Sequence, residues 1–330
     1  MMNIYKMADT RIVETHDIED GVWVNLIAPT AAEIEGLAER LQLDPDWLTA
    51  ALDEEERSRI DTEPELGQTL ILVDVPFIDI EPGCMGEQQS FFGSATSPGR
   101  HSRMYDTLPL GIIYTPVCIV TVCLKESPVT QSFIENRIKT FYTHKKSRFI
   151  LQILYRTAEL YLFHLKQIDK QSVAIEAELH KSMKNKELIQ LLDLEKSLVY
   201  FSTSLKGNEL VMERLLRFEF IRKYPDDTEL LEDTIIENKQ AIEMAKIYSD
   251  ILAGTMDAFA SVISNNLNIV MKFLASITIV MSIPTMISGF FGMNVLLPLE
   301  DHPWAFVIII VITLAACGTA AWIMARKKMF

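Results

Sequence analysis

The sequence has little of what enzyme centres and disulfide-stabilised folds are built from. Its 330 residues include only four cysteines, and these are too scattered to form a metal site or a redox pair. No Ser/His/Asp-like set, phosphate-binding loop or HExxH motif is present, and we interpret the acidic run at 53–56 as a solvated helix end. We therefore expect a protein that is not an enzyme, with reduced thiols.

Positive charge is also scarce. The chain has 31 lysines and arginines against 45 aspartates and glutamates, which gives a net charge of −14. A nucleic-acid partner is therefore disfavoured, because binding to a phosphate backbone depends on lysine and arginine. The excess acid lies on the part of the chain before residue 273, where it can form a solvated surface and can also collect divalent cations.

Two long runs near the C-terminus have no charge at all. Residues 273–291 and 304–325 contain no Asp, Glu, Lys, Arg or His. Each is long enough to supply the about 20 helical residues that cross the apolar core of a bilayer, and the link between them is too short for a domain. The sequence therefore predicts a hairpin of two transmembrane helices after a large soluble region.

The few basic residues near these runs predict their orientation. Lys272 precedes the first run and 326–328 follow the second, whereas the link carries Glu300 and Asp301 and no lysine or arginine. Because basic flanks stay in the cytoplasm, we expect both termini inside the cell and the link outside. The first residues lack the apolar core of a signal peptide, which fits a soluble region that stays in the cytosol.

The chain is predicted to have three parts, and its fold class is an α+β membrane protein. Residues 1–128 predict a cytosolic α/β domain, 129–265 a helical stalk domain and 266–330 the transmembrane domain. In the first part we expect a helix at 30–52 and a long loop, rich in Gly, Ser and Pro, at 83–103. The expected strands, rich in Val, Leu and Ile, are 22–26, 70–77, 110–114 and 117–124.

The stalk is predicted to contain three long helices. Two antiparallel helices are expected at 147–183 and 186–221, and a third begins at a cap formed by Asp227 or Thr228. No cluster of breakers follows before Phe291, so this helix is expected to run unbroken into the first span. Its apolar residues alternate by threes and fours, as in a coiled coil; they are Leu231, Ile235, Ile242, Ala245, Leu252, Met256, Phe259 and Ile263. We interpret them as a seam for self-association, and the alternative is packing against the two preceding helices.

The same spacing continues into the first span as a stripe that includes polar residues. Polar residues at membrane depth usually face a bundle interior or a water path, so the stripe predicts a pore wall. The alternative for each hydroxyl is a hydrogen bond to its own backbone. The pore-lining candidates are Asn268, Met271, Leu274, Ala275, Thr278, Ser282, Thr285 and Gly289.

The first span ends at Gly292-Met293-Asn294, which begins the outward link. At this point the sequence resembles the CorA family of divalent-cation channels. The resemblance is strongest over 264–330, in Asn268-Ile269-Val270-Met271-Lys272 and in 289–294. It is looser over the helical part and includes the stretch 56–61 in the N-terminal part.

The resemblance implies a funnel-shaped homopentamer in which each subunit contributes one long helix to the pore. Gly292, Met293 and Asn294 would form the selectivity filter, with the Asn294 amide facing a hydrated Mg²⁺ at the outer mouth. The physics fits this role, because Mg²⁺ dehydrates reluctantly and prefers oxygen ligands. A ring of neutral amide oxygens can bond the water molecules of the ion without removing them.

Further roles carry over to matching positions. Asn268 matches a polar ring at the cytosolic end, Met271 and Leu274 match an apolar constriction, and Thr285 matches a polar ring nearer the outside. Asp233 matches an acid at a subunit interface where the family binds regulatory Mg²⁺ and holds the closed state. The N-terminal partner of that acid stays open among three candidates, which are Glu63, Glu65 and Asp74.

The sequence also departs from the family pattern. Phe291 stands where tyrosine is usual, Pro284 lies one position later than the common proline, and Leu296 stands where an acid is often found. Glu300 lies where the family often has glutamate, in a ring that would raise the local cation concentration. His302 is an extra residue that could ligate zinc, although a lone histidine in a loop is usually solvated.

These features favour a channel for Mg²⁺, and with it Co²⁺ or Ni²⁺, in which Mg²⁺ is both substrate and regulator. No permanently bound cofactor is expected, and the partners are divalent ions, membrane lipid and further copies of the chain. One alternative is the sister branch of the family that moves Zn²⁺, with or without protons. Another is a non-conducting, membrane-anchored sensor or scaffold.

Overall fold

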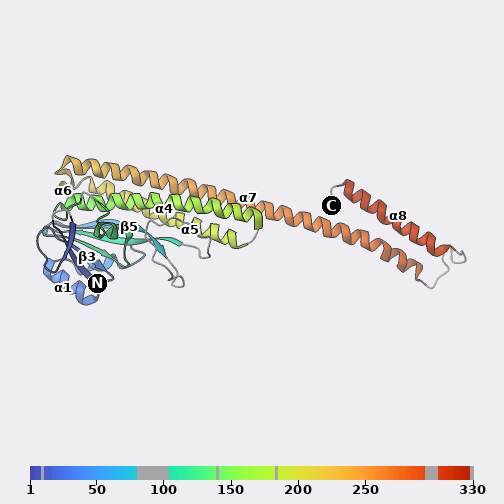
Figure 1. Ribbon diagram of the computed structural model, residues 1–330, viewed down its shortest axis with the longest axis horizontal. Helices are drawn as coiled ribbons and strands as arrows, with labels where there is room; N and C mark the ends of the chain where they lie inside the picture. Colours follow the sequence, from blue (N-terminus) through green and yellow to red (C-terminus); the bar gives the residue numbers. More distant parts are fainter. Residues whose placement is uncertain (9–10, 80–103, 139–140, 183–184, 294–303, 328–330) are drawn as a thin grey trace. The chain divides into compact units, whose positions relative to one another are not determined.

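Figure 1 shows the computed structural model of the chain. It describes all residues except 9–10, 80–103, 139–140, 183–184, 294–303 and 328–330. The chain forms two compact units, Met1–Ala253 and Gly254–Phe330, which are called the first and the second unit below. The first unit contains the predicted α/β part and most of the predicted stalk, whereas the loop predicted at 83–103 lies outside the described residues.

The first unit is built on one mixed sheet. Its described strands lie in the order β2-β1-β3-β7-β6-β5-β4. β3 and β7 run parallel, and every other pair of neighbours is antiparallel. The strands are β1 (Met2–Ala8), β2 (Arg11–Thr15), β3 (Trp23–Ile27), β4 (Arg59–Glu63), β5 (Gln68–Asp79), β6 (Met104–Tyr114) and β7 (Ile119–Cys123).

Both faces of the sheet are covered by helices. In β5, Val73 and Val75 belong to one apolar cluster while Leu70 and Leu72 belong to the other, because successive side chains of a strand point to opposite faces. One face packs on α1 (Ala31–Leu41) and α2 (Pro45–Ala50), and Figure 1 shows α1 on the opposite side of the sheet from α4 and α5. The other face packs on α3 (Pro128–Ile134), α4 (Lys146–Ser182) and α5 (Asn185–Leu215).

The four predicted strands correspond to β3, β5, β6 and β7, whereas the sequence pattern does not predict β1, β2 and β4. Neither β2 nor β4 contains a buried residue. A strand without a buried face has no alternation of apolar and polar side chains, so its sequence gives no period-two signal.

The prediction of a single helix at 30–52 is wrong, because this stretch forms two separate helices, α1 and α2. α1 ends where Gln42 adopts a left-handed conformation with φ of 53°. Asp44 then caps α2 by accepting a hydrogen bond from the N–H of Asp46 at 3.0 Å, and Pro45 occupies the first turn. Proline suits the first turn of a helix and not its interior, so it begins a new helix here.

The second stalk helix also differs from the prediction. α4 matches the helix expected at 147–183, but the helix expected at 186–221 consists of α5 and the short α6 (Glu219–Arg222). The N–H groups of Arg217 and Phe218 bond to carbonyls three residues earlier, those of Arg214 and Leu215. This tightening of the last turn ends α5.

The third stalk helix, α7 (Pro225–Phe291), begins earlier than predicted. The N–H groups of Asp227 and Thr228 bond to the carbonyl of Tyr224, so both residues already lie in the first turn. Asp227 does not act as the cap, because its buried carboxylate accepts a hydrogen bond from Ser147 Oγ at 2.7 Å. The predicted unbroken course to Phe291 is confirmed.

Most of the apolar seam of α7 is buried or partly buried within the chain itself, whereas Ile263 is exposed. Leu231, Ile235, Ala245 and Leu252 are buried in the first unit, and the first two belong to the cluster under α4 and α5. Our interpretation of these residues as a self-association seam is therefore wrong, and the alternative, packing on the preceding helices, holds for them. Other apolar side chains of α7 are exposed in the single chain; they are Ile236, Ile247 and Ile251.

Candidate functional site

Two described helices are long and apolar enough to cross a membrane. They are α7 and the segment Phe306–Arg326 of α8 (Ala305–Arg326). These helices match the two spans predicted at 273–291 and 304–325. The candidate site lies on the part of α7 that belongs to the second unit.

Two faces of α7 can be distinguished by their exposure. Ser276 is buried and Val280, Ile283, Pro284 and Ile287 are partly buried, at a spacing of three and four residues. The Cys317 thiol of α8 lies 3.8 Å from the carbonyl oxygen of Val280, which marks this face as the one that packs on α8.

The predicted pore-lining residues lie on the other side of α7. Thr278 and Ser282 follow Ser276 and Val280 by two positions, which is about 200° around a helix with 3.6 residues per turn. All of the candidates are exposed in the single chain; they are Asn268, Met271, Leu274, Ala275, Thr278, Ser282, Thr285 and Gly289. The stripe is therefore free to face an aqueous path or a partner.

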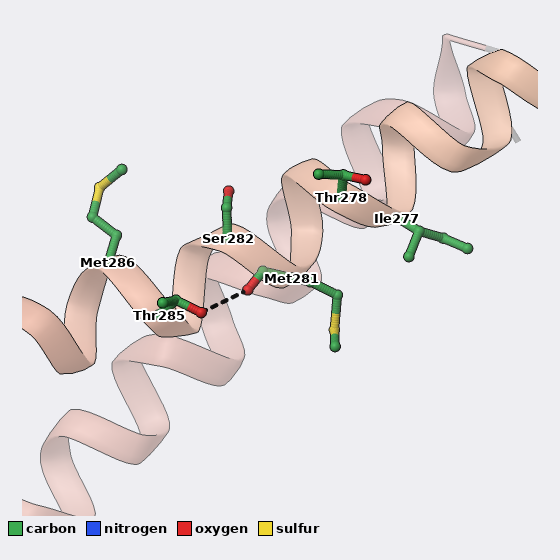
Figure 2. A pocket seen from close by; sticks show the side chains of 6 residues that line it. All are labelled: Ile277, Thr278, Met281, Ser282, Thr285 and Met286. Carbon is green, nitrogen blue, oxygen red and sulfur yellow. Dashed lines mark hydrogen bonds between the residues drawn. The ribbon is translucent and has the colours of Figure 1, made fainter.

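The outer half of the stripe forms a shallow, open groove on the surface of α7. It is lined by Ile277, Thr278, Met281, Ser282, Thr285 and Met286. Figure 2 shows the Met281 and Met286 side chains pointing away from each other, with the hydroxyl groups of Ser282 and Thr285 between them. Ile277, Met281 and Met286 are not among the predicted pore residues; the sequence signal that could have found them is their position next to the stripe.

Each hydroxyl of this groove donates its hydrogen to the helix. Thr278 Oγ1 donates to the Leu274 carbonyl and Ser282 Oγ to the Ile279 carbonyl, both at 2.8 Å. Thr285 Oγ1 donates to the Met281 carbonyl at 3.3 Å, the bond drawn in Figure 2. The alternative considered for these residues, bonding to their own backbone, is thus what the structure shows. Because the donor is used, each oxygen presents only its lone pairs outward, as a neutral acceptor.

The described part of α7 ends at the motif. The N–H of Gly292 bonds to the Ser288 carbonyl at 3.0 Å, and that of Met293 bonds to the Phe290 carbonyl at 3.3 Å. A Cβ atom added to Gly292 would lie 3.1 Å from the Ser288 oxygen, so this tight end of the helix favours glycine. Asn294, Glu300, Asp301 and His302 lie outside the described residues.

Asp233, the predicted regulatory acid, is exposed on α7 within the first unit. Burial raises the pKa of Tyr155 on α4, and the negative charges of Glu159, Glu237 and Asp233 raise it further. These three acids therefore surround one tyrosine, and Glu159 is paired with Arg156 at 2.9 Å. Within the part of the chain that the structure describes, no group of three or more His, Cys, Asp or Glu side chains is arranged to hold a metal ion.

The three candidate partners of Asp233 differ in their surroundings. Glu63 and Glu65 are exposed at the end of β4 and in the turn that follows it. Asp74 lies in β5, where its carboxylate accepts a hydrogen bond from Ser58 Oγ at 3.3 Å. Burial raises the pKa of Asp74, and hydrogen bonds from Ser204 and Ser58 oppose this shift.

A side-chain amide that the sequence does not single out completes the sheet beside Asp74. β4 pairs with β5 only up to Leu72, so the backbone of Asp74 has no strand partner on that side. Asn208 of α5 takes this place: its Oδ1 accepts from the Asp74 N–H at 2.9 Å and its Nδ2 donates to the Asp74 carbonyl at 2.8 Å. Asp74 is therefore part of the connection between the sheet and α5.

Comparison with known proteins gives a consistent result. The family described as "CorA-like Mg2+ transporter protein" matches residues 19–327. The cobalt/magnesium transport protein CorA of Methanocaldococcus jannaschii is 24% identical over 319 residues, which cover 92% of this chain and 91% of that protein.

Solved structures share the fold. The complete structure of the CorA magnesium transporter from Methanocaldococcus jannaschii has a TM-score of 0.79 at 21% identity, over 99% of this chain and 98% of that one. The cytoplasmic domain of ZntB from Vibrio parahaemolyticus has a TM-score of 0.55 at 12% identity, over 81% of this chain and 97% of that one.

Proposed function

This chain belongs to the CorA-like Mg²⁺ transporter family, and we propose that it is a membrane channel through which Mg²⁺, and also Co²⁺, enters the cell. The observation that carries this proposal is the exposed stripe of hydroxyl acceptors on α7, which leads to Gly292 and Met293. Entry would be driven by the membrane potential, which is worth about 4.6 kcal/mol for a divalent ion at 100 mV.

The chemistry of the stripe suits a cation that keeps its water. The outward hydrogens of the first water shell of Mg²⁺ need acceptors, and Mg²⁺ gives up that shell reluctantly. The oxygens of Thr278, Ser282 and Thr285 are neutral acceptors whose own hydrogens are already bonded. They can therefore bond the passing water molecules without the tight binding that a carboxylate would cause.

The proposed channel is a homopentamer, with both termini in the cytoplasm and Asn294 in a ring at the outer mouth. A single α7 cannot enclose a path, and its exposed apolar residues Ile236, Ile247 and Ile251 support contacts with further copies. Glu300 and Asp301 would concentrate cations outside the filter.

Closure is proposed to depend on internal Mg²⁺ bound near Asp233. Without the ion, the negative charges around Tyr155 repel one another, the interface loosens and the pore opens. The ion thereby biases a two-state element, because it binds one state more tightly than the other.

Zn²⁺ transport is the second candidate function. It is favoured by His302 in the outer link and by Phe291 before the motif, where the family pattern has tyrosine. The likeness to the ZntB domain concerns the fold alone. A non-conducting sensor is a weaker alternative, because an anchor needs no stripe of acceptors.

The deciding experiment is ion uptake into proteoliposomes, with Mg²⁺ and Zn²⁺ reporters side by side, with and without a pH gradient. Mg²⁺ entry that does not depend on the gradient is the expected result. Zn²⁺ entry that follows the gradient would support the sister branch, and no flux from a verified pentamer would support the sensor.

A matched pair of variants tests the role of the stripe in the same assay. Thr285→Val removes an acceptor of the groove and should slow Mg²⁺ entry roughly fivefold, the effect of about 1 kcal/mol from one lost hydrogen bond. Thr313→Val is the control, because Thr313 makes the same bond to its own helix, at 2.7 Å to the Ile309 carbonyl, but lies on α8. Equal effects of the two variants would contradict the proposed path.

A further inference from the structure

Pro284 leaves one carbonyl of the proposed pore helix without its usual donor. It lies inside α7, between the hydroxyl-bearing Ser282 and Thr285. Proline has no N–H, so the bond that residue 284 would donate to the Val280 carbonyl cannot form, and the proline ring presses against that carbonyl. At membrane depth no bulk water replaces the missing donor.

A thiol of the neighbouring helix lies at this carbonyl. Cys317 Sγ of α8 is 3.8 Å from the Val280 oxygen, within the range of a weak S–H···O hydrogen bond. Neighbouring residues on the partly buried face of α8 are small; they are Ala316, Ala320 and Ala321. Small side chains allow two helix backbones to approach closely in a membrane, so the short thiol can reach across.

We propose that Cys317 is a positioning residue, whose thiol supplies the donor that Pro284 removes from the Val280 carbonyl. By holding this carbonyl, α8 sets the direction in which α7 bends. The proposal rests on the proposed function in one respect, which is that the turns after the bend line the ion path.

A bend at Pro284 would lie in the middle of the acceptor stripe, so its direction matters for the proposed path. Thr278 and Ser282 precede Pro284, whereas Thr285 and Gly289 follow it. The hydroxyl oxygens before and after the bend can contact the same hydrated ion only if the bend keeps them on one side. Helix bends at proline are set by what surrounds the freed carbonyl, so the alignment of the groove depends on Cys317.

A double-mutant cycle on the full chain in proteoliposomes tests this inference. Cys317→Ala should lower the initial rate of Mg²⁺ uptake about threefold. This factor corresponds to the about 0.6 kcal/mol measured for hydrogen bonds between membrane helices. Cys317→Ser keeps a donor and should stay near the wild-type rate. Pro284→Ala returns an N–H to the Val280 carbonyl, so Cys317→Ala should have no further effect in that background.

Two outcomes of the cycle would overturn the proposal. Equal rates for Cys317→Ala and Cys317→Ser would show that the donor is irrelevant. A full effect of Cys317→Ala in the Pro284→Ala background would show that Cys317 acts through packing alone. If Cys317→Ala fails to assemble, Cys317→Val takes its place in the cycle, since it keeps the volume of the side chain.

Infrared spectroscopy gives a readout that does not need flux. The S–H stretching band of Cys317, assigned by its disappearance in the alanine or valine variant, should lie at the frequency of a hydrogen-bonded thiol. A band at the frequency of a free thiol would overturn the proposal. A chain that carries no Mg²⁺ would contradict the proposed function, whereas the infrared band would still test the contact between Cys317 and Val280.

Discussion

Replacing His164 by leucine should make the first unit less sensitive to acid. His164 lies on α4 with 6% of its surface exposed, and its ring packs against that of Tyr105 with 5.7 Å between the ring centres. Among the described residues, no hydrogen-bond partner faces its Nδ1. Burial lowers the pKa of His164 from 6.5 to about 4, because the charged imidazole loses its water.

The sign and size of the effect follow from linkage. A histidine whose pKa is lowered by folding takes up its proton in the unfolded chain first, so stability falls as the pH drops from 6.5 towards 4. The difference of about 2.5 between the two pKa values corresponds to about 3 kcal/mol in full. At pH 5 the unfolded chain is protonated and the folded chain mostly is not, and about 2 kcal/mol is lost.

Urea unfolding of the full chain in detergent at pH 7 and pH 5 measures this loss. Once Trp304 and Trp322 are replaced by phenylalanine, tryptophan fluorescence reports on the first unit alone, through the buried Trp23 and the partly buried Trp47. The wild type should lose about 2 kcal/mol more than His164→Leu between the two pH values. His180→Leu is the control, because His180 lies on the same helix but is 65% exposed, and it should keep the wild-type response.

Other ionisable groups near His164 do not bias the comparison between the wild type and His164→Leu. Glu135, Arg137 and Arg156 line the same small cavity of about 30 Å³, and they are present in both proteins. Identical losses in the wild type and His164→Leu would refute the reasoning, since the imidazole would then be solvated or charged in the folded chain.

Three further predictions concern the proposed channel. Asn294→Ala should abolish selective Mg²⁺ uptake while the oligomer stays intact on size-exclusion chromatography; normal uptake would remove Asn294 from the filter. Asp233→Lys should weaken closure at high internal Mg²⁺, because a positive charge replaces an acid beside Glu237 and Tyr155; unchanged protection by Mg²⁺ against proteolysis would argue against a sensor there. Chemical cross-linking in detergent should give species of up to five subunits, and a ladder that ends at two would contradict the pentamer.

The features that sequence reasoning predicts best are local ones. The two spans follow from the absence of charge over 273–291 and 304–325, and both agree with helices of the structure. The unbroken course of α7 follows from the absence of breakers, and the family follows from a motif whose residues are consecutive. Each signal lies within a short stretch of chain, so no knowledge of distant partners is needed.

The errors arise where a distant partner decides. Leu231 and Ile235 show the spacing of a coiled coil whether they face a second copy or the helices of their own chain, and only the packing under α4 and α5 distinguishes the two. Strands β2 and β4 have no buried residue, so they exist because neighbouring strands supply their hydrogen bonds. Asp227 looks like a cap in the sequence, yet Ser147 binds its carboxylate.

The amino-acid sequence by itself determines the two membrane helices, the hydroxyl stripe of α7 and the motif at the end of that helix. Apolar runs, helical spacing and a motif of consecutive residues are all properties of neighbouring residues. Tertiary structure alone decides which face of α7 is covered. It also decides which side chains bond to backbone N–H and C=O groups that have no partner in a helix or strand. Asn208 replaces a strand at Asp74, and Cys317 lies at the carbonyl that Pro284 leaves without a donor. These pairs are far apart in the chain, and a hydrogen bond forms wherever folding brings a donor within reach of an acceptor.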